Sequence, residues 1–373
     1  MPRRIAVTGT RGKSGVTRLI AAGLRASGAR VLAKTTGSKP VLILPDGSER
    51  VIARAGGASI REQVRLVALA AELGADTLAA EMMSIGPECL RVESRRILRP
   101  GTLAVTNVRL DHLDDMGRDR DAIARTLASA VPDGADVFVP EEEAYEAFAG
   151  AAWKAGARLH RIAREERGGL TGAEIPEQLQ PGEFEPNLRL ARAVLGALGV
   201  DRTAADRGMA GAAPDAGSLG IRHGLFGRPP RPATCVSLFA ANEPESSAAA
   251  LAEVFGRMLR AGRPLVGLLA LREDRGDRTL QWVRAAGDGF FRDFAAVVLV
   301  GPPARPALRR LRRTKPPGAT VFSAAGGESP EEVMDRVMAA VAGEPVVVGL
   351  GNFVGPGESL VRHWEREGTA HDR

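Results

Sequence analysis

The chain has 373 residues, of which 44% are hydrophobic, 26% charged and 4% aromatic. This is the composition of an ordinary globular protein with an aliphatic core, and it excludes disordered and fibrous classes. No apolar run approaches the ~20 residues of a bilayer-spanning helix, and the opening residues lead into a strand-like run rather than a secretory signal. The sequence therefore predicts a cytoplasmic protein of two domains.

Charge and cysteine content further restrict the classes of partner and of structural site that this protein could have. The 51 Lys and Arg against 45 Asp and Glu give a net charge of +6. These charges are spread along the chain apart from an arginine-rich run at 309–313, and few aromatics are interleaved with them, so nucleic-acid binding is not expected. An anionic substrate or polymer is compatible with the excess of arginine. Cys89 and Cys235 form no CxxC pattern, so neither a disulfide framework nor a zinc knuckle is predicted.

Short Val, Ile and Leu runs alternate with amphipathic Ala, Leu and Arg stretches, which is typical of βαβ units around a mostly parallel sheet. In the first half we expect strands at residues 5–8, 31–33, 77–80, 103–106 and 137–139. Helices are expected between them at 14–26, 60–73, 121–130 and 142–154, with a closing helix at 188–198. Residues 1–223 are therefore predicted to form one doubly wound α/β domain.

A segment rich in Gly, Pro and Arg, residues 224–232, interrupts the alternation and is predicted to be a linker, because proline cannot donate to a ladder or continue a helix. Beyond it we expect strands at 234–239, 265–269, 296–300, 320–322 and 346–349. Helices are expected at 246–261, 279–287, 330–341 and 358–366. Residues 233–373 are thus predicted to form a second, smaller α/β domain.

The first chemical motif lies between the first strand and the first helix and reads Gly9-Thr10-Arg11-Gly12-Lys13-Ser14. A strand, a glycine-rich loop and a helix are the context of a phosphate-binding loop. The backbone N–H groups and the helix N-terminus favour phosphate, Lys13 is expected to reach the β and γ oxygens, and Ser14 is expected to offer its hydroxyl to Mg²⁺. The motif departs from GxxxxGK[ST] in having Val7 where the first glycine is expected.

Two more motifs follow strands. Glu81-Met82-Met83-Ser84 comes after the third predicted strand, and a run from Thr106 to Gly117 that contains Asp111-His112 comes after the fourth. Because ligands of open α/β sheets bind at the carboxyl ends of the strands, the three motifs are expected to share one crevice. Ser14, Glu81 and His112 suit Mg²⁺, or alternatively Mn²⁺. Taken singly, a Glu at a strand end is more often a solvated charge or helix cap, and a lone His is more often a hydrogen-bonded loop residue, but the joint arrangement of Ser14, Glu81 and His112 favours the cation site.

In this order the motifs resemble the Mur ligase and folylpolyglutamate synthetase superfamily, and most specifically the ligase subunit of poly-γ-glutamate synthase. The resemblance extends to further segments: Lys34-Thr35-Thr36-Gly37, residues 111–117, Pro214-Asp215-Ala216-Gly217, and residues 239–247, 272–279 and 349–352. It implies a P-loop domain like the Mur ligase central domain, followed by a Rossmann-like domain. It also implies an ATP- and Mg²⁺-dependent ligase that activates a glutamate γ-carboxylate as an acyl phosphate and joins it to another glutamate.

The resemblance implies roles for individual residues. Lys13, Glu81 and His112 are the expected catalytic residues, and Asn187 and Asn242 are expected to contact the nucleotide, although Asn187 is explained almost as well as a helix cap. The expected substrate contacts are Lys34, Thr35, Thr36, Arg272, Arg275, Asp277 and Arg278, since guanidinium groups fit carboxylates bidentately. The alternatives are a β-turn at 34–36 and a self-neutralising loop of salt bridges at 272–278.

The resemblance also implies partners: glutamate and the growing poly-γ-glutamate as substrates, a small integral-membrane subunit and an export subunit. These would hold the protein at the inner face of the membrane, and self-association into a homo-oligomer is left open. Many Mur ligases carry a carbamylated lysine after the Asp-His motif, but residues 123–128 contain no lysine, so a second Mg²⁺ is not expected. A P-loop NTPase without ligase activity, a nucleotide-binding regulatory subunit and a ligase for another acceptor remain as alternatives.

Overall fold

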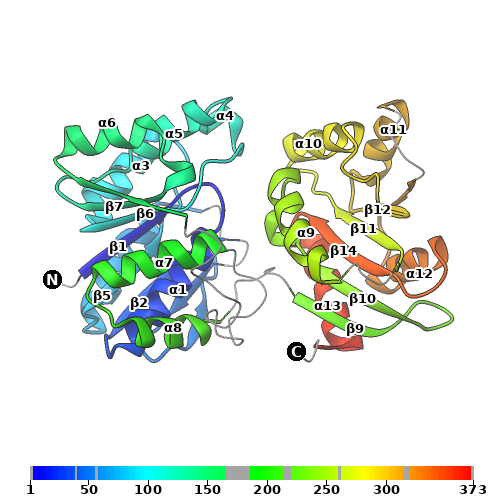
Figure 1. Cartoon of the computed structure of the whole chain (residues 1–373), viewed down its shortest axis with the longest axis horizontal. Coiled ribbons are helices and arrows are strands. Elements are labelled where there is room, and N and C mark those ends of the chain that lie inside the picture. The colour runs from blue at the N-terminus through cyan, green and yellow to red at the C-terminus, as the bar shows by residue number, and fades with distance from the viewer. Residues whose placement is uncertain are drawn as a thin grey trace. The chain divides into compact units, whose positions relative to one another are not determined.

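The computed structural model describes residues 3–37, 40–54, 58–164, 185–213, 220–258, 262–314 and 320–370. The chain divides into two compact units, Met1–Asp215 and Ala216–Arg373, each built on its own sheet (Figure 1). Within the described residues, no helix is both long enough and apolar enough to cross a bilayer.

The first unit contains an eight-stranded sheet in the order β4-β3-β2-β5-β1-β6-β7-β8. Its strands are β1 (Arg3–Thr8), β2 (Val31–Thr35), β3 (Val41–Ile43), β4 (Glu49–Val51), β5 (Thr77–Glu81), β6 (Thr102–Val105), β7 (Asp136–Pro140) and β8 (Arg158–Ile162). The pairings are parallel except where β3 joins β2 and β4 joins β3. Strands buried on both faces, as β2 and β5 are, require helices on both sides of the sheet.

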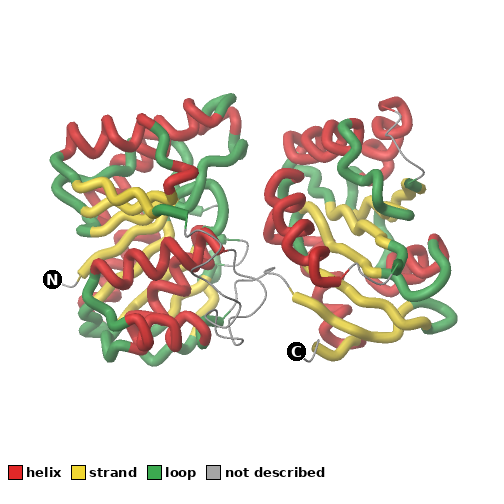
Figure 2. The backbone as a smooth tube through the Cα atoms, in the orientation of Figure 1, coloured by secondary structure: helices red, strands yellow, loops and turns green. Residues whose placement is uncertain are grey.

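Helices cover both faces of this sheet (Figure 2). Packed on one face are α1 (Lys13–Ala26), α7 (Glu185–Ala197) and α8 (Arg202–Ala210). Packed on the other are α2 (Arg61–Glu72), α3 (Pro87–Val92), the π-helical segment η1 (Glu93–Leu98), α5 (Arg120–Ala128) and α6 (Glu146–Ala155). Short turns complete the unit at α4 (Leu113–Met116) and η2 (Glu141–Glu143).

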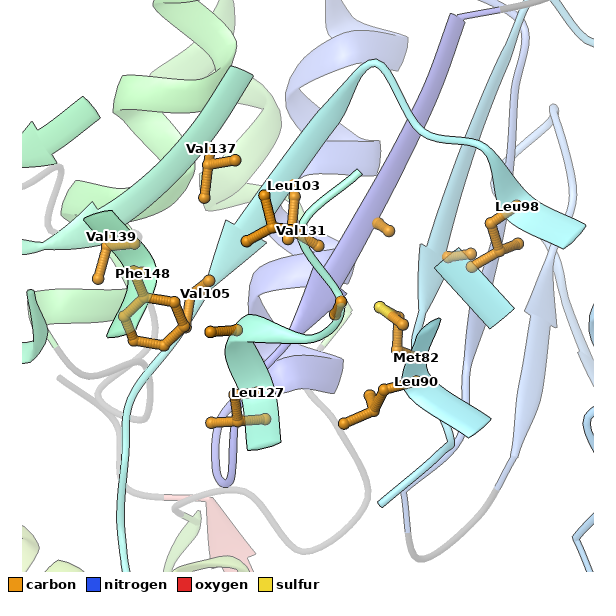
Figure 3. Packing of buried hydrophobic residues seen from close by; sticks show 14 of the residues in the cluster. Met82, Leu90, Leu98, Leu103, Val105, Leu127, Val131, Val137, Val139 and Phe148 are labelled. Atoms are coloured by element: carbon orange, nitrogen blue, oxygen red, sulfur yellow. The ribbon is translucent and has the colours of Figure 1, made fainter. Parts of the chain in front are cut away.

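The hydrophobic core between the sheet and the helices α2, α3, α5 and α6 is shown in Figure 3. There Leu103 and Val105 of β6 pack in one cluster with Leu127 of α5 and Phe148 of α6. These four side chains are at most 1% exposed. Burial of each such side chain contributes about 1.5–3 kcal/mol relative to leaving it in water. This packing fixes the position of β6 and therefore of the motif that begins at its carboxyl end.

The central place of β1 brings the three motifs together. Strand β1 pairs in parallel with both β5 and β6, and the ladder continues past the strand ends. Met82 N donates to Val7 O at 2.9 Å, and Thr106 N donates to Thr8 O at 2.9 Å. The carboxyl ends of β5, β1 and β6 therefore lie at one edge of the sheet, as the sequence predicted.

The second unit contains a seven-stranded sheet in the order β13-β12-β11-β14-β10-β9-β15. Its strands are β9 (Gly220–Phe226), β10 (Arg231–Ser237), β11 (Leu265–Ala270), β12 (Ala296–Val300), β13 (Val321–Ala325), β14 (Val346–Gly351) and β15 (Gly368–Ala370). Its helical segments are η3 (Phe239–Ala241), α9 (Pro244–Met258), α10 (Gly276–Gly287), α11 (Ala304–Thr314), α12 (Pro330–Ala340), η5 (Phe353–Gly357) and α13 (Glu358–Glu367). Strands β10 to β14 are parallel, and β9 and β15 are antiparallel.

Two groups of aromatic side chains pack this sheet. On one face, Trp364 of α13 stacks on Phe239 with ring centroids 5.9 Å apart. In the other group, Trp282 of α10 stacks on Phe291 at 6.0 Å. Trp282 and Trp364 are each 1% exposed, so each tryptophan anchors its helix to the domain core.

The segment at 224–232 is not a linker, and this expectation is corrected. It contains the end of β9 and the start of β10, which form an antiparallel hairpin in which Pro232 pairs with Leu225. Gly227 has a φ of +83° in the turn. Gly and Pro therefore shape a tight turn inside the second unit, and the division between the units falls earlier, after Asp215.

The predicted strands and helices are otherwise found with shifts of a few residues at their ends. The sequence analysis did not identify β3, β4, β8, β9 and β15, nor α3, η1, α4, α8 and α11. The predicted helix at 246–261 corresponds to α9, and the last three predicted residues, 259–261, lie outside the described residues. The arginine-rich run at 309–313 lies on α11.

Candidate active site

The loop between β1 and α1 has the backbone conformation that a phosphate-binding loop needs. Gly9 has a φ of +126° and Gly12 a φ of +73°. A Cβ at Gly9 would lie 2.1 Å from Thr106 Oγ1, and a Cβ at Gly12 would lie 2.8 Å from the amide of Asn187. Side chains are therefore excluded at both positions. Helix α1 begins without a side-chain cap and without an acid in its first turn, so its N-terminal amides are available to an anion.

Residues 106 and 107, directly after β6, hold the loop in this shape. Asn107 Oδ1 accepts hydrogen bonds from Thr10 Oγ1 at 2.7 Å and from Arg11 N at 3.0 Å. Thr106 donates its hydroxyl to Arg11 O at 2.5 Å. The sequence analysis included both residues in a motif but gave them no function. They brace the loop against β6.

Lys13 folds back over the loop that precedes it. Its ammonium donates to Gly9 O at 2.9 Å and to Thr10 O at 3.3 Å. Burial lowers the pKa of Lys13 from its ordinary value, while the negative charges of Glu81 and Asp111 oppose that shift. An anion bound in the loop would act in the same direction as these carboxylates and favour the charged ammonium.

Glu81 connects three segments of the first unit at the end of β5. It is 3% exposed, and its Oε2 accepts a hydrogen bond from Ser14 Oγ at 2.7 Å and another from Thr36 N at 2.6 Å. Among the described residues, both side-chain hydrogen bonds of this carboxylate reach Oε2. The hydroxyl of Ser14 and the carboxylate of Glu81 are thus already side by side, and this donor pair suits a hard divalent cation.

A second buried carboxylate supports the segment that follows Glu81. Glu93 is fully buried and accepts hydrogen bonds from Met83 N at 3.0 Å and Ser84 N at 2.9 Å. Gln63 Nε2 bridges Glu93 Oε1 at 2.6 Å and the carbonyl of Glu81 at 2.9 Å. Sequence reasoning missed Glu93 and Gln63, since nothing in their local pattern distinguishes them from ordinary helix residues.

His112 lies beside Asp111, directly before the short helix α4. It has a φ of +45°, and its Nε2 is 3.8 Å from Asp111 Oδ2. Asp111 also lies 3.4 Å from Arg11 Nη2, which ties it to the phosphate loop. In the described part of the chain, no group of three His, Cys, Asp or Glu side chains is arranged to hold a metal ion.

Lys34 and Thr35 are the last residues of β2 and Thr36 follows the strand, so residues 34–36 do not form a β-turn. Lys34 is 1% exposed, and its ammonium lies 3.2 Å from Glu62 Oε2. Burial lowers the pKa of Lys34, and the neighbouring Glu62 opposes that shift. Thr35 is fully buried, and its hydroxyl has no hydrogen-bond partner among the described residues. Thr36 contributes its amide to Glu81.

In the second unit, Asn242 and Glu243 precede α9. Asn242 has a φ of +58°, and its carbonyl accepts a hydrogen bond from Trp282 Nε1 at 3.2 Å. The carboxylate of Glu243 accepts from Glu245 N and Ser246 N, each at 2.8 Å, and therefore caps the helix. The side-chain amide of Asn242 makes no hydrogen bond to the described residues, so it is available to a ligand.

The arginines after β11 fall into two groups. Arg272 forms a bidentate contact with Asp274 at 2.9 and 2.6 Å, and Arg275 Nε is 3.6 Å from Asp277. Arg278 is instead buried, at 7% exposed, and donates to Asn352 Oδ1 at 3.1 Å. The ion pairs of Arg272 and Arg275 agree with the alternative that residues 272–278 form a self-neutralising loop of salt bridges. Arg278 instead connects α10 to the end of β14.

The structure therefore brings together Ser14, Glu81, Thr36 and the loop of residues 9–14, with Asn187 packed on Gly12. The expected motif at 214–217 lies outside the described residues.

Comparisons with known proteins identify both units. Residues 7–189 match the family model described as Mur ligase middle domain, and residues 226–367 match the model described as poly-gamma-glutamate synthase CapB C-terminal domain. Over 365 residues the chain is 30% identical to the capsule biosynthesis protein CapB of Bacillus anthracis, covering 97% of this chain and 76% of that protein. It is 28% identical over 367 residues to PGA synthase CapB of Bacillus subtilis, covering 97% and 90%.

A solved structure supports the fold. The bifunctional folylpolyglutamate synthase/dihydrofolate synthase of Yersinia pestis, complexed with AMPPNP and a Mn ion, superimposes with a TM-score of 0.64 at 18% identity, covering 98% of this chain and 88% of that one. At this identity the likeness concerns the fold. It confirms the predicted class, a doubly wound P-loop domain followed by a second α/β domain.

Proposed function

This chain belongs to the CapB family of poly-γ-glutamate synthases, ATP-dependent ligases of the Mur ligase superfamily that join glutamate through its γ-carboxylate, and we propose how its residues carry out that reaction. The observation that supports the proposal is the pairing of Ser14 with the buried Glu81 beside the phosphate loop. A bare P-loop NTPase is not favoured, because the relatives match both units over 97% of the chain.

ATP is proposed to bind at the loop of residues 9–14. The amides at the start of α1 and the ammonium of Lys13 are the groups that attract its phosphates. Lys13 already hydrogen-bonds to loop carbonyls, so the loop holds the ammonium close to where phosphate oxygens are expected. Asn187 and Asn242 are proposed as further nucleotide contacts. The open amide of Asn242 and the packing of Asn187 on Gly12 support those roles.

The residues present fit a divalent cation. Ser14 offers a hydroxyl and the buried Glu81 offers a carboxylate beside it, and both are hard oxygen donors. We propose that these two hold Mg²⁺ or Mn²⁺, with His112 as a third candidate. A cation there supplies positive charge that neutralises the phosphates of ATP.

The proposed reaction has two steps, phosphoryl transfer and amide formation. The γ-carboxylate of glutamate attacks the γ-phosphorus of ATP, which forms γ-glutamyl phosphate and breaks the bond to ADP. The amine of a second glutamate, after losing a proton, attacks the acyl carbon, and inorganic phosphate leaves as the amide forms. The chain contributes positioning and electrostatic stabilisation, which are the main catalytic terms in phosphoryl transfer.

Glutamate recognition is proposed for two places. In the first unit, the buried hydroxyl of Thr35 has no hydrogen-bond partner within the described residues, and the next residue, Thr36, donates its amide to Glu81. Lys34, which precedes them in the chain, is proposed to contribute through its buried ammonium, which forms an ion pair with Glu62. In the second unit, Arg272, Arg275 and Asp277 are proposed to contact the carboxylate and ammonium groups of glutamate, and Arg278 to hold that loop through Asn352.

Partners are proposed from the resemblance to synthase ligase subunits. A small integral-membrane subunit and an export subunit would hold the chain at the inner face of the membrane and receive the polymer. The relatives are capsule biosynthesis and PGA synthase proteins, which supports an assembly of this kind.

Trapping of the acyl phosphate tests the proposal. Purified protein is incubated with ATP, Mg²⁺, glutamate and hydroxylamine, and γ-glutamyl hydroxamate and ADP are measured. We expect glutamate-dependent formation of both, lost in Lys13→Ala and Glu81→Ala. The exposed residues Lys154 and Glu88 of the same unit provide matched controls as Lys154→Ala and Glu88→Ala, which should retain activity. ADP release that ignores glutamate would contradict ligase chemistry.

A further inference from the structure

Helix α11 carries the densest group of arginines in the second unit. Its inner side, formed by Ala304, Ala307 and Leu311, is buried in the domain. Its other positions include the α11 arginines, which are Arg305, Arg309, Arg310, Arg312 and Arg313, and all five are exposed. The helix lies beside α10 at one end of the second unit (Figure 1). Over the ~12 Å from residue 305 to 313, the surface therefore presents five positive charges.

These charges are not neutralised locally. In the described part of the chain, no carboxylate lies within 4.0 Å of any α11 arginine, whereas other arginines of the same unit have such partners. Arg336 pairs with Glu328, Arg362 with Glu358, Arg366 with Glu331, and Arg228 lies 3.8 Å from Asp335. Within the described residues, the α11 surface is thus a positive patch without ion pairs and not a solvated network of salt bridges.

A groove between α10 and α11 extends the patch. Arg310 of α11 and Arg284 of α10 both line it, together with one acid, Asp288. The groove has a volume of about 470 Å³. Arg284 is exposed and has no carboxylate partner among the described residues. Positive side chains from two helices therefore border one concave surface.

We propose that the α11 arginines and Arg284 form a binding surface for the growing poly-γ-glutamate chain. The inference rests on the proposed function, because the γ-linked polymer is its product. Each γ-linked residue keeps a free α-carboxylate, so the product is a regular polyanion. Guanidinium groups bind carboxylates bidentately and bring less hydration than an ammonium does, so several arginines in a row match several carboxylates in a row.

The helix itself favours this occupant over other polyanions. A helix that binds a lipid surface needs an exposed apolar side to insert, but the apolar side of α11 is already packed in the core. Single-stranded nucleic acids need aromatic side chains for stacking, and the large exposed hydrophobic residues described in the second unit are Leu225, Leu280 and Val321. A flexible polycarboxylate requires only charge and hydrogen-bond donors. A surface that holds the polymer between successive additions of glutamate would favour long polymers.

Binding of a preformed polymer tests the inference without turnover. The probe is a fluorescently labelled γ-linked glutamate oligomer, measured by anisotropy over a range of salt concentrations. The test variant combines Arg309→Gln, Arg310→Gln, Arg312→Gln and Arg313→Gln. The control combines Arg228→Gln, Arg336→Gln, Arg362→Gln and Arg366→Gln, which removes the same charge from the same unit. Thermal unfolding of both variants verifies that they fold.

The expected loss is about tenfold in affinity for the test variant, with a shallower salt dependence, since a few charge contacts together are worth about 1.4 kcal/mol. The control should lose less than about twofold. Equal weakening in both variants, or unchanged oligomer binding with lost binding to anionic lipid vesicles, would overturn the inference. The α11 variant should keep glutamate-dependent ADP release while its products become shorter. If the wild-type chain releases no such ADP, the proposed function fails, and the oligomer measurement still decides the inference.

Discussion

The hydroxyl of Ser14 donates a 2.7 Å hydrogen bond to the buried carboxylate of Glu81, and this contact joins the first turn of α1 to the carboxyl end of β5. The two residues are 67 positions apart in the sequence. They meet because β1 and β5 are parallel neighbours whose ends lie at one edge of the sheet. The loop of residues 9–14 and an acidic residue are thereby brought together by topology.

Glu81→Gln tests the charge at this position while preserving shape. The amide oxygen can still accept from Ser14 and Thr36, so Tm should change by only a few degrees. Loss of the negative charge should weaken the use of Mg²⁺ and reduce glutamate-dependent ADP release by roughly 100-fold. Steady-state assays over a range of Mg²⁺ concentrations measure this. A variant with wild-type Mg²⁺ dependence would show that Glu81 holds no cation.

Glu93→Gln tests the carboxylate that supports the segment after Glu81. Glutamine would present an amide N–H to the N–H groups of Met83 or Ser84, leaving buried donors unpaired at a cost of about 1–3 kcal/mol. Because that segment begins at Glu81, we also expect a higher Mg²⁺ concentration for half-maximal rate. The exposed Glu88→Gln on the same face is the control. A lower Tm with unchanged Mg²⁺ response would restrict Glu93 to a structural role.

Arg278→Ala and Arg272→Ala should differ in their effect on the free energy of unfolding. Arg278 is buried and bonded to Asn352, so its removal should lower the free energy of unfolding by about 1.5–3 kcal/mol. Arg272 makes an exposed pair with Asp274, so its removal should cost under about 1 kcal/mol. If Arg272 contacts glutamate, its loss should instead raise the KM for glutamate. Denaturant unfolding and kinetics separate the two effects, and equal destabilisation would contradict the assignment.

The free energy of unfolding should decrease at acid pH, in part because Glu62 becomes protonated. Burial alone raises the pKa of this carboxyl, but hydrogen bonds and charge from Arg54 and Lys34 prevail and lower it from 4.5 to about 2. Because the folded pKa lies below the unfolded one, this stabilisation is complete above about pH 5 and is lost as pH falls toward 2. Glu62→Gln should therefore have a lower Tm at neutral pH and a flatter Tm profile between pH 5 and 3. Profiles that run parallel to wild type would contradict this.

The sequence predicted the phosphate loop and its acidic partner because both are local motifs at strand ends. Asn107, Glu93 and Gln63 could not be found in this way, since their roles depend on contacts with residues far along the chain. The segment at 224–232 was misjudged because Gly and Pro shape hairpin turns as well as linkers. The short strands β3 and β4 have too few residues to show a periodic pattern, although the turn at Asp46-Gly47 between them was a usable signal.

Oxygen transfer from glutamate to phosphate tests the central claim most directly. Glutamate labelled with oxygen-18 in its γ-carboxylate is incubated with the protein, ATP, Mg²⁺ and unlabelled acceptor glutamate, and the released phosphate is examined by mass spectrometry. Activation through γ-glutamyl phosphate predicts one labelled oxygen in each phosphate released with amide formation. Release of phosphate without label, at the same rate with and without glutamate, would show that the chain hydrolyses ATP and does not ligate.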